Sequence, residues 1–139
     1  MIIKTVQTDT ITLASHRLHD VLDKALPKIE DKSVIVVTSK IVSLCEGRVV
    51  KIGEADKDEL IKQESDQYIP TGMSPLGVTL TVTRNLLVPS AGIDESNGNG
   101  YYILWPKDPQ ASAVSLRSYL AKKHGLTHLG VLITDSRTT

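Results

Sequence analysis

The sequence of 139 residues contains no phenylalanine, one tryptophan and one cysteine. We expect no stacking platform for single-stranded nucleic acid, because such sites need several exposed aromatic side chains. The single cysteine, Cys45, excludes an internal disulfide and is typical of a reducing compartment. No apolar run approaches membrane-spanning length, and residues 1–30 lack the continuous apolar core of a signal peptide. These absences favour a soluble, cytoplasmic protein.

The sequence also has no net charge. Lys plus Arg and Asp plus Glu balance at 16 each, so no global field attracts nucleic acid or an anionic membrane. The length is that of one domain with a real core, and we find no internal repeat or interdomain linker. We therefore expect a single domain, residues 1–139, that binds neither nucleic acid nor a membrane.

Hydrophobic periodicity predicts helices and strands in an irregular order. Predicted helices cover residues 18–26, 55–68 and 109–123, the first closed by Pro27 and the last stopped by Gly125. Predicted strands cover residues 2–6, 33–38, 46–52, 78–83, 85–88, 101–105 and 129–134. The runs 33–38 and 129–134 are continuously apolar or β-branched, so we expect both strands to be buried. This irregular order predicts an α+β (mixed α/β) fold, with a mixed sheet flanked by helices.

The most informative segment is residues 91–97, Ala-Gly-Ile-Asp-Glu-Ser-Asn. It places two carboxylates, a hydroxyl and a carboxamide in four consecutive residues, from Asp94 to Asn97. Hard oxygen donors of this kind suit Mg²⁺ or Mn²⁺, ions that usually serve phosphate chemistry. The alternative is an ordinary polar turn before the strand at 101–105, since Asp, Ser, Asn and Gly are common turn residues.

A second candidate lies at the end of the chain, where an apolar run ends abruptly in Thr134, Asp135 and Ser136. Open α/β sheets often place ligand-binding groups at the carboxyl end of a buried strand. The alternative is a strand that simply emerges into a polar loop. Two such segments in one small chain make a metal shared by Asp94 and Asp135 more plausible than either segment does alone.

The block of residues 36–50 carries a third candidate. Ser39, Lys40 and Ser43 follow the predicted strand 33–38, and such a segment can offer backbone N–H groups and a positive charge to phosphates. No Gly-x-x-x-x-Gly-Lys-Ser/Thr pattern is present, so this is not a P-loop. A solvated surface turn with a stray lysine is an equally good reading of these residues by themselves.

Taken together, four blocks resemble the coenzyme F-420:L-glutamate ligase (γ-glutamyl ligase) family. They are residues 36–50, 91–97, 106–113 and 133–136, which occur in the order of the family and are spread over most of the chain. Each block is weak alone, but the ordered set is fairly specific. The resemblance implies the γ-glutamyl ligase fold and a GTP-dependent enzyme that adds L-glutamate to a deazaflavin cofactor of the F-420 type, in coenzyme F-420 biosynthesis.

The resemblance also implies roles for particular residues. Asp94 and Asp135 would be catalytic and would bind Mn²⁺ or Mg²⁺ together with Ser136. Ser39 and Lys40 would contact the guanine nucleotide, and Asn97 would donate hydrogen bonds to the nucleotide or substrate. The resemblance further implies a homodimer whose partners are GTP, L-glutamate and a deazaflavin-type acceptor.

The chain departs from the family pattern in several places. The family commonly carries a second lysine where Leu44 stands, and it continues Ser/Thr-Phe-Gly-Arg-Pro where this chain reads Ser136-Arg137-Thr138-Thr139. Family members also carry a Leu-Pro-rich segment near the N-terminus, of which residues 9–13 keep at most the apolar character. Family enzymes are considerably longer, so we expect these residues to be the N-terminal part of a longer protein, truncated at the C-terminus, or to be completed by a partner chain, and to be inactive or nearly so alone. Two alternatives follow: a non-catalytic nucleotide- or metal-binding homologue, and a ligase of the same fold with a folate-like acceptor.

Overall fold

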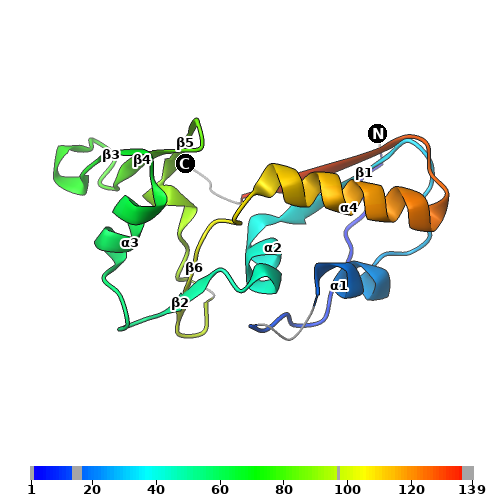
Figure 1. The fold of residues 1–139 in the computed structure, drawn as a ribbon, viewed down its shortest axis with the longest axis horizontal. Helices are drawn as coiled ribbons and strands as arrows, with labels where there is room; N and C mark the ends of the chain where they lie inside the picture. Colours follow the sequence, from blue (N-terminus) through cyan, green and yellow to red (C-terminus); the bar gives the residue numbers. More distant parts are fainter. Residues whose placement is uncertain (1, 14–16, 97, 136–139) are drawn as a thin grey trace. The chain divides into compact units, whose positions relative to one another are not determined.

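The computed structural model describes residues 2–13, 17–96 and 98–135. Helices and strands alternate without a regular pattern (Figure 1), which confirms the predicted α+β class. The elements are α1 (Leu18–Ala25), β1 (Ser33–Thr38), α2 (Ser39–Glu46), β2 (Val49–Lys51), α3 (Lys57–Glu64), β3 (Gln67–Ile69), η1 (Thr71–Met73), β4 (Leu80–Thr83), β5 (Leu86–Pro89), η2 (Ser90–Gly92), β6 (Tyr101–Ile103), α4 (Pro109–His124) and β7 (Leu129–Thr134). No helix among the described residues is both long and apolar enough to cross a membrane.

The chain is organised in two compact units. Unit 1 combines Met1–Gly47 with Pro106–Thr139, and unit 2 is Arg48–Trp105. Unit 1 therefore contains the first and last strands of the chain, and unit 2 contains all the strands between them. That the whole chain forms a single domain stays a prediction.

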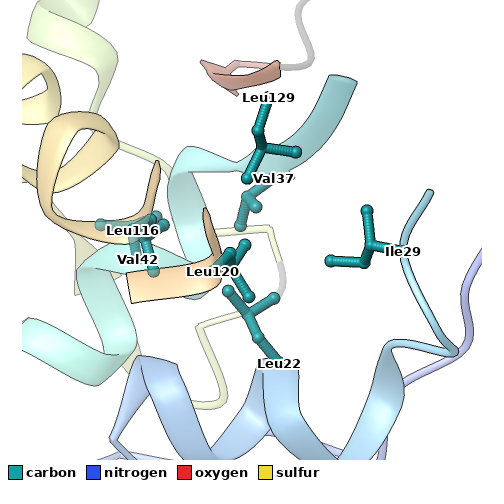
Figure 2. Packing of buried hydrophobic residues seen from close by; sticks show 7 residues of the cluster. All are labelled: Leu22, Ile29, Val37, Val42, Leu116, Leu120 and Leu129. Atoms are coloured by element: carbon teal, nitrogen blue, oxygen red, sulfur yellow. The ribbon is translucent and has the colours of Figure 1, made fainter. Parts of the chain in front are cut away.

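Unit 1 is built around a parallel pair of strands, β1 and β7. Their register runs from Ser33 opposite Leu129 to Thr38 opposite Thr134. Helix α4 packs on β7, and α2 packs on β1. Figure 2 shows the apolar side chains that meet between these elements and α1, all of them at most 6% exposed: Leu22, Ile29, Val37, Val42, Leu116, Leu120 and Leu129. The spacing of Leu116 and Leu120, one helical turn apart, places both on the buried face of α4.

The β1–β7 pair corrects one expectation. Both strands lie where the sequence predicts them, but they are not buried on both faces. Val37 is 5% exposed and faces the core, whereas Val34, Val36 and Leu132 are 54–59% exposed. Because side chains alternate across a strand, one face of this pair covers the core and the other presents apolar side chains. A continuous apolar run does not by itself reveal whether a second layer covers its other face.

A carboxylate joins the starts of these two strands. Asp31 accepts hydrogen bonds from the backbone N–H groups of Thr127 (2.9 Å) and His128 (2.7 Å), and its other oxygen lies 3.0 Å from His128 Nδ1. The backbone N–H of Lys32 donates to the carbonyl of His128 over 2.8 Å. The hydrogen bonds from His128, above all that from its backbone, lower the pKa of the Asp31 carboxyl. This contact fixes where β1 and β7 begin relative to each other.

Unit 2 contains an antiparallel sheet of order β3–β4–β5 and an antiparallel pair of β2 with β6. The β4–β5 hairpin turns at Arg84 and Asn85, whose φ values of 51° and 62° are those of a left-handed turn. Helix α3 contributes Leu60 and Ile61 to the core of this unit. The other buried members of the core come from η2, β6 and the residues beside them: Ala91, Ile93, Tyr102 and Leu104.

Three sequence predictions are wrong in detail. Residues 2–6 form no strand, and Ile2 and Ile3 are 85% and 80% exposed, because no neighbouring strand pairs with them in the described chain. The predicted strand 46–52 shrinks to Val49–Lys51, since its first residue belongs to helix α2, which the sequence did not predict. The predicted helix 55–68 spans only Lys57–Glu64, and its last two predicted residues, Gln67 and Tyr68, belong to β3.

Candidate functional site

Ser39 and Lys40 are the first two residues of helix α2, directly after β1. The helix ends at Gly47, whose φ of 69° is left-handed. Its N-cap is Thr38, whose side chain accepts no hydrogen bond from the first turn within the described part of the chain. The backbone N–H groups of the first turn have no partner inside a helix and point away from its N-terminal end. Together with the helix dipole, they favour the binding of an anion there. The geometry is therefore that of a strand running into a helix N-terminus, rather than a solvated surface turn.

The two candidates differ in exposure. Ser39 is only 4% exposed, whereas Lys40 is half-buried. A phosphate at this turn would therefore meet the backbone of Ser39 more readily than its hydroxyl. Lys40 is the residue of this turn that can bring a positive charge to such a ligand.

Asp135 lies at the same end of the parallel pair. It follows Thr134 directly, and Thr134 is paired in register with Thr38, the residue before Ser39. Adjacent strands in a sheet are about 4.8 Å apart, so the chain leaves β1 and β7 at neighbouring points. Asp135 itself is exposed. The structure thus brings together two candidates, Ser39 and Asp135, that are far apart in the sequence.

Asp94 belongs to unit 2, where its backbone is tied to β6. It exchanges both hydrogen bonds with Ile103, at 2.9 Å and 2.7 Å, so that it extends the edge of the sheet by one bridge. Its side chain is half-buried, and its Oδ1 accepts hydrogen bonds from the backbone N–H (2.7 Å) and the Oγ (2.8 Å) of Ser96. These contacts orient the carboxylate. The next residue, Glu95, forms an ion pair of 3.1 Å with Lys57.

The turn before Asp94 was missed by sequence reasoning. Ser90, Ala91 and Gly92 all have positive φ, at 52°, 51° and 72°. Only Gly92 gives a hint of this in the sequence, because Ser and Ala rarely adopt this conformation. The segment that precedes the metal candidate is therefore an unusual left-handed turn, not a simple loop.

The predicted site residues are distributed over both units. Ser39, Lys40 and Asp135 belong to unit 1, and Asp94 belongs to unit 2, so their convergence stays a prediction. Asn97 and Ser136 lie outside the described residues. Among the described residues, no group of three or more His, Cys, Asp or Glu side chains could hold a metal ion.

The donor chemistry nevertheless fits the expected ions. Asp94 and Asp135 supply carboxylate oxygens, which hard cations such as Mg²⁺ and Mn²⁺ prefer, and such ions usually keep water or substrate oxygens as further ligands. Burial foremost, and Glu46 beside it, raise the pKa of the Cys45 thiol and oppose formation of the thiolate, the form in which cysteine binds metals.

The start of α2 and Asp135 lie at one edge of the β1–β7 pair, and a helix N-terminus of this kind is able to bind an anion. Comparison with known families is more specific. Residues 11–139 match the model of the family described as F420-0:Gamma-glutamyl ligase, and the chain belongs to this family.

Curated relatives agree with this assignment. The chain is 30% identical to the coenzyme F420:L-glutamate ligase of Methanopyrus kandleri, over 79% of this chain and 50% of that protein. It is 31% identical to the enzyme of the same name from Archaeoglobus fulgidus, over 78% of this chain and 49% of that protein. It is 28% identical to the enzyme of the same name from Methanosarcina mazei, over 78% of this chain and 48% of that protein. The chain thus spans about half the length of the curated relatives it matches.

Proposed function

We propose that this chain is part of a GTP- and divalent-metal-dependent ligase that joins L-glutamate through an amide bond to a carboxylate acceptor of the deazaflavin F-420 type. Membership of the ligase family supports the reaction class. The observation that carries the proposal within this molecule is the shared edge of β1 and β7, where Ser39 and Asp135 follow residues paired in register. Phosphate and metal ligands are needed side by side in phosphoryl transfer.

In the proposed reaction, the acceptor carboxylate is activated first. The terminal phosphoryl group of GTP passes to a carboxylate oxygen, GDP leaves, and an acyl phosphate forms. The amine of glutamate then attacks the acyl carbon and gives up a proton, the bond between that carbon and the phosphate oxygen breaks, and the amide and inorganic phosphate remain.

The residues of the chain have separate tasks in this scheme. The first turn of α2 and Lys40 hold the phosphates of the nucleotide through N–H groups and charge. Asp94 and Asp135, with Ser136, would hold Mn²⁺ or Mg²⁺, and Asn97 would donate hydrogen bonds to the nucleotide or substrate. A divalent ion bound there supplies positive charge that offsets the charge on the phosphate oxygens. Ser96 holds the carboxylate of Asp94 in one orientation, and this suits Asp94 to metal binding.

The test uses the protein expressed from its complete gene, supplied with Mn²⁺, GTP, glutamate and a deazaflavin acceptor. We expect release of phosphate in step with a mass gain of one glutamyl unit. Asp94→Asn should abolish both while the fold is retained, because it removes a charge but little volume. The matched control is Glu95→Gln, which changes the neighbouring carboxylate that pairs with Lys57 and should leave turnover in place.

Other outcomes separate the remaining hypotheses. Turnover with a folate-like acceptor in place of the deazaflavin would identify a ligase of the same fold with another substrate. Nucleotide binding without turnover on either acceptor would identify a non-catalytic homologue. The proposed homodimer rests on the family resemblance and is checked by the mass of the protein in solution.

A further inference from the structure

The left-handed turn η2 ends two residues before the proposed metal ligand Asp94. Its three residues have φ values of 52°, 51° and 72°, and the turn is closed by a hydrogen bond of 2.9 Å from the N–H of Ile93 to the carbonyl of Ser90. For Ser90 and Ala91 this conformation is strained, because a Cβ crowds the following carbonyl oxygen. Such a turn persists only where surrounding contacts hold it.

One buried hydroxyl supplies the contact at the centre of the turn. Thr81, on strand β4, is 1% exposed. Its Oγ1 accepts a hydrogen bond of 3.0 Å from the backbone N–H of Ala91 and donates one to the carbonyl of Val88. A single threonine side chain thereby satisfies a donor in η2 and an acceptor in β5, and links the turn to the sheet. Because the N–H of Ala91 is buried, leaving it unpaired is costly, whereas the carbonyl of Val88 is only part-buried.

The turn is also held on its two sides. Ala91 is 0% exposed and Ile93 is 7% exposed, and both pack in the core with Leu60 and Ile61 of α3. Between them, Gly92 lies against the ring of Trp105, where a Cβ would come within 2.9 Å of Cδ1. These contacts therefore fix the direction in which the backbone leaves η2, and Asp94 is the second residue after the turn.

We propose that Thr81 is a positioning residue for Asp94: its hydroxyl fixes η2 so that the carboxylate is presented for metal binding. The proposal rests on the proposed function, in which Asp94 binds Mn²⁺ or Mg²⁺. Thr81 touches neither metal nor substrate and acts through the backbone of Ala91. Residues that orient a metal ligand in this way change metal affinity when they are replaced.

The experiment measures Mn²⁺ affinity by calorimetry, without nucleotide, in the protein expressed from its complete gene. Thr81→Val keeps the shape but removes the hydroxyl, and should weaken Mn²⁺ binding on the order of 10-fold or more. Thr81→Ser keeps the hydroxyl and should restore the wild-type affinity. Thr79→Val is the matched control: Thr79 is also buried, at 8% exposed, and its hydroxyl bonds Thr71 (2.9 Å). Its backbone carbonyl accepts a hydrogen bond of 2.8 Å from the N–H of Ser90 in the turn, a contact that the side-chain substitution keeps. The Mn²⁺ affinity of Thr79→Val should stay at the wild-type value.

The outcomes distinguish this inference from the proposed function. If the wild type binds no Mn²⁺, or Asp94→Asn binds it equally well, the metal role of Asp94 fails. If Asp94→Asn loses Mn²⁺ but Thr81→Val keeps the wild-type affinity, the positioning role of Thr81 is overturned. Should Thr81→Val not fold, Thr81→Ala removes the same hydroxyl with a smaller side chain, and its Mn²⁺ affinity is measured instead. Weaker Mn²⁺ binding by Thr81→Ala than by Thr81→Ser supports the inference, and equal binding overturns it.

Discussion

Replacing Gly92 by alanine tests how firmly the turn before Asp94 is set. Two separate effects should lower the free energy of unfolding. Gly92 has a φ of 72°, where a residue with a Cβ pays about 1–2 kcal/mol. In addition, the new Cβ would lie 2.9 Å from Cδ1 and 3.0 Å from Cγ of Trp105, a contact that forces the ring or the backbone to move. Overpacking of this kind costs about 1–3 kcal/mol. Together these costs predict a loss of about 2–5 kcal/mol in the free energy of unfolding.

A second glycine in the same unit separates the two costs. Gly77 has a φ of 65°, and no described atom lies within 4 Å of a Cβ added there. Gly77→Ala should therefore lose only the backbone cost of about 1–2 kcal/mol. The difference between the two variants, about 1–3 kcal/mol, measures the contact with Trp105.

Urea unfolding followed by fluorescence measures both variants, with Trp105, the single tryptophan of the sequence, as the probe. In Gly92→Ala the emission of the folded protein should also shift, because the indole ring is displaced. Equal losses for Gly92→Ala and Gly77→Ala would refute the reasoning, since they would mean that Trp105 yields without cost and does not restrain η2.

Three further predictions concern unit 1. Lys40→Ala should weaken GDP or GTP binding in the presence of Mn²⁺ by about 1–3 kcal/mol, the scale of a charge-assisted hydrogen bond, and equal affinity in calorimetry would exclude Lys40 from the site. Leu120→Ala empties a position that is 1% exposed and should cost about 2–5 kcal/mol of unfolding free energy. Val114→Ala, on the same helix but 54% exposed, should change the unfolding free energy by less than about 0.5 kcal/mol. Similar losses for Leu120→Ala and Val114→Ala would contradict the assigned core. Hydrogen bonds foremost from His128 lower the pKa of Asp31, so its stabilising contribution is complete above its unfolded pKa of about 3.9 and is lost as the pH falls through the lower folded pKa. Asp31→Asn should therefore flatten the fall in unfolding free energy on acidification, and an unchanged pH curve would show that Asp31 contributes nothing.

Some elements could be predicted because their signal is local. The apolar spacing that forms α4 and the glycine that ends it are both written in consecutive residues, and α4 runs from Pro109 to His124 with Gly125 as its C-cap. The β-branched run of β1 is equally local, and its bounds are those predicted, Ser33–Thr38. In both cases one short stretch of chain contains the whole pattern.

Other elements could not be predicted because neighbours in space decide them. Residues 2–6 have a strand pattern but no pairing strand, so they remain exposed. Helix α2 was missed because its residues, with Ile41 and Val42 among them, favour strands as much as a short helix. Packing against β1 and the start of the helix at Ser39 decide in favour of the helix.

The sequence by itself determined the chemistry that is available and its place along the chain. It predicts carboxylates at Asp94 and Asp135, a lysine after β1, and membership of a ligase family through the order of its motifs. Tertiary structure decided which groups meet. The parallel register of β1 and β7 sets Asp135 beside the start of α2, and the hydroxyl of Thr81 reaches the backbone of Ala91. Contacts of this kind depend on strand register and core packing between distant segments, and no local pattern of residues encodes them.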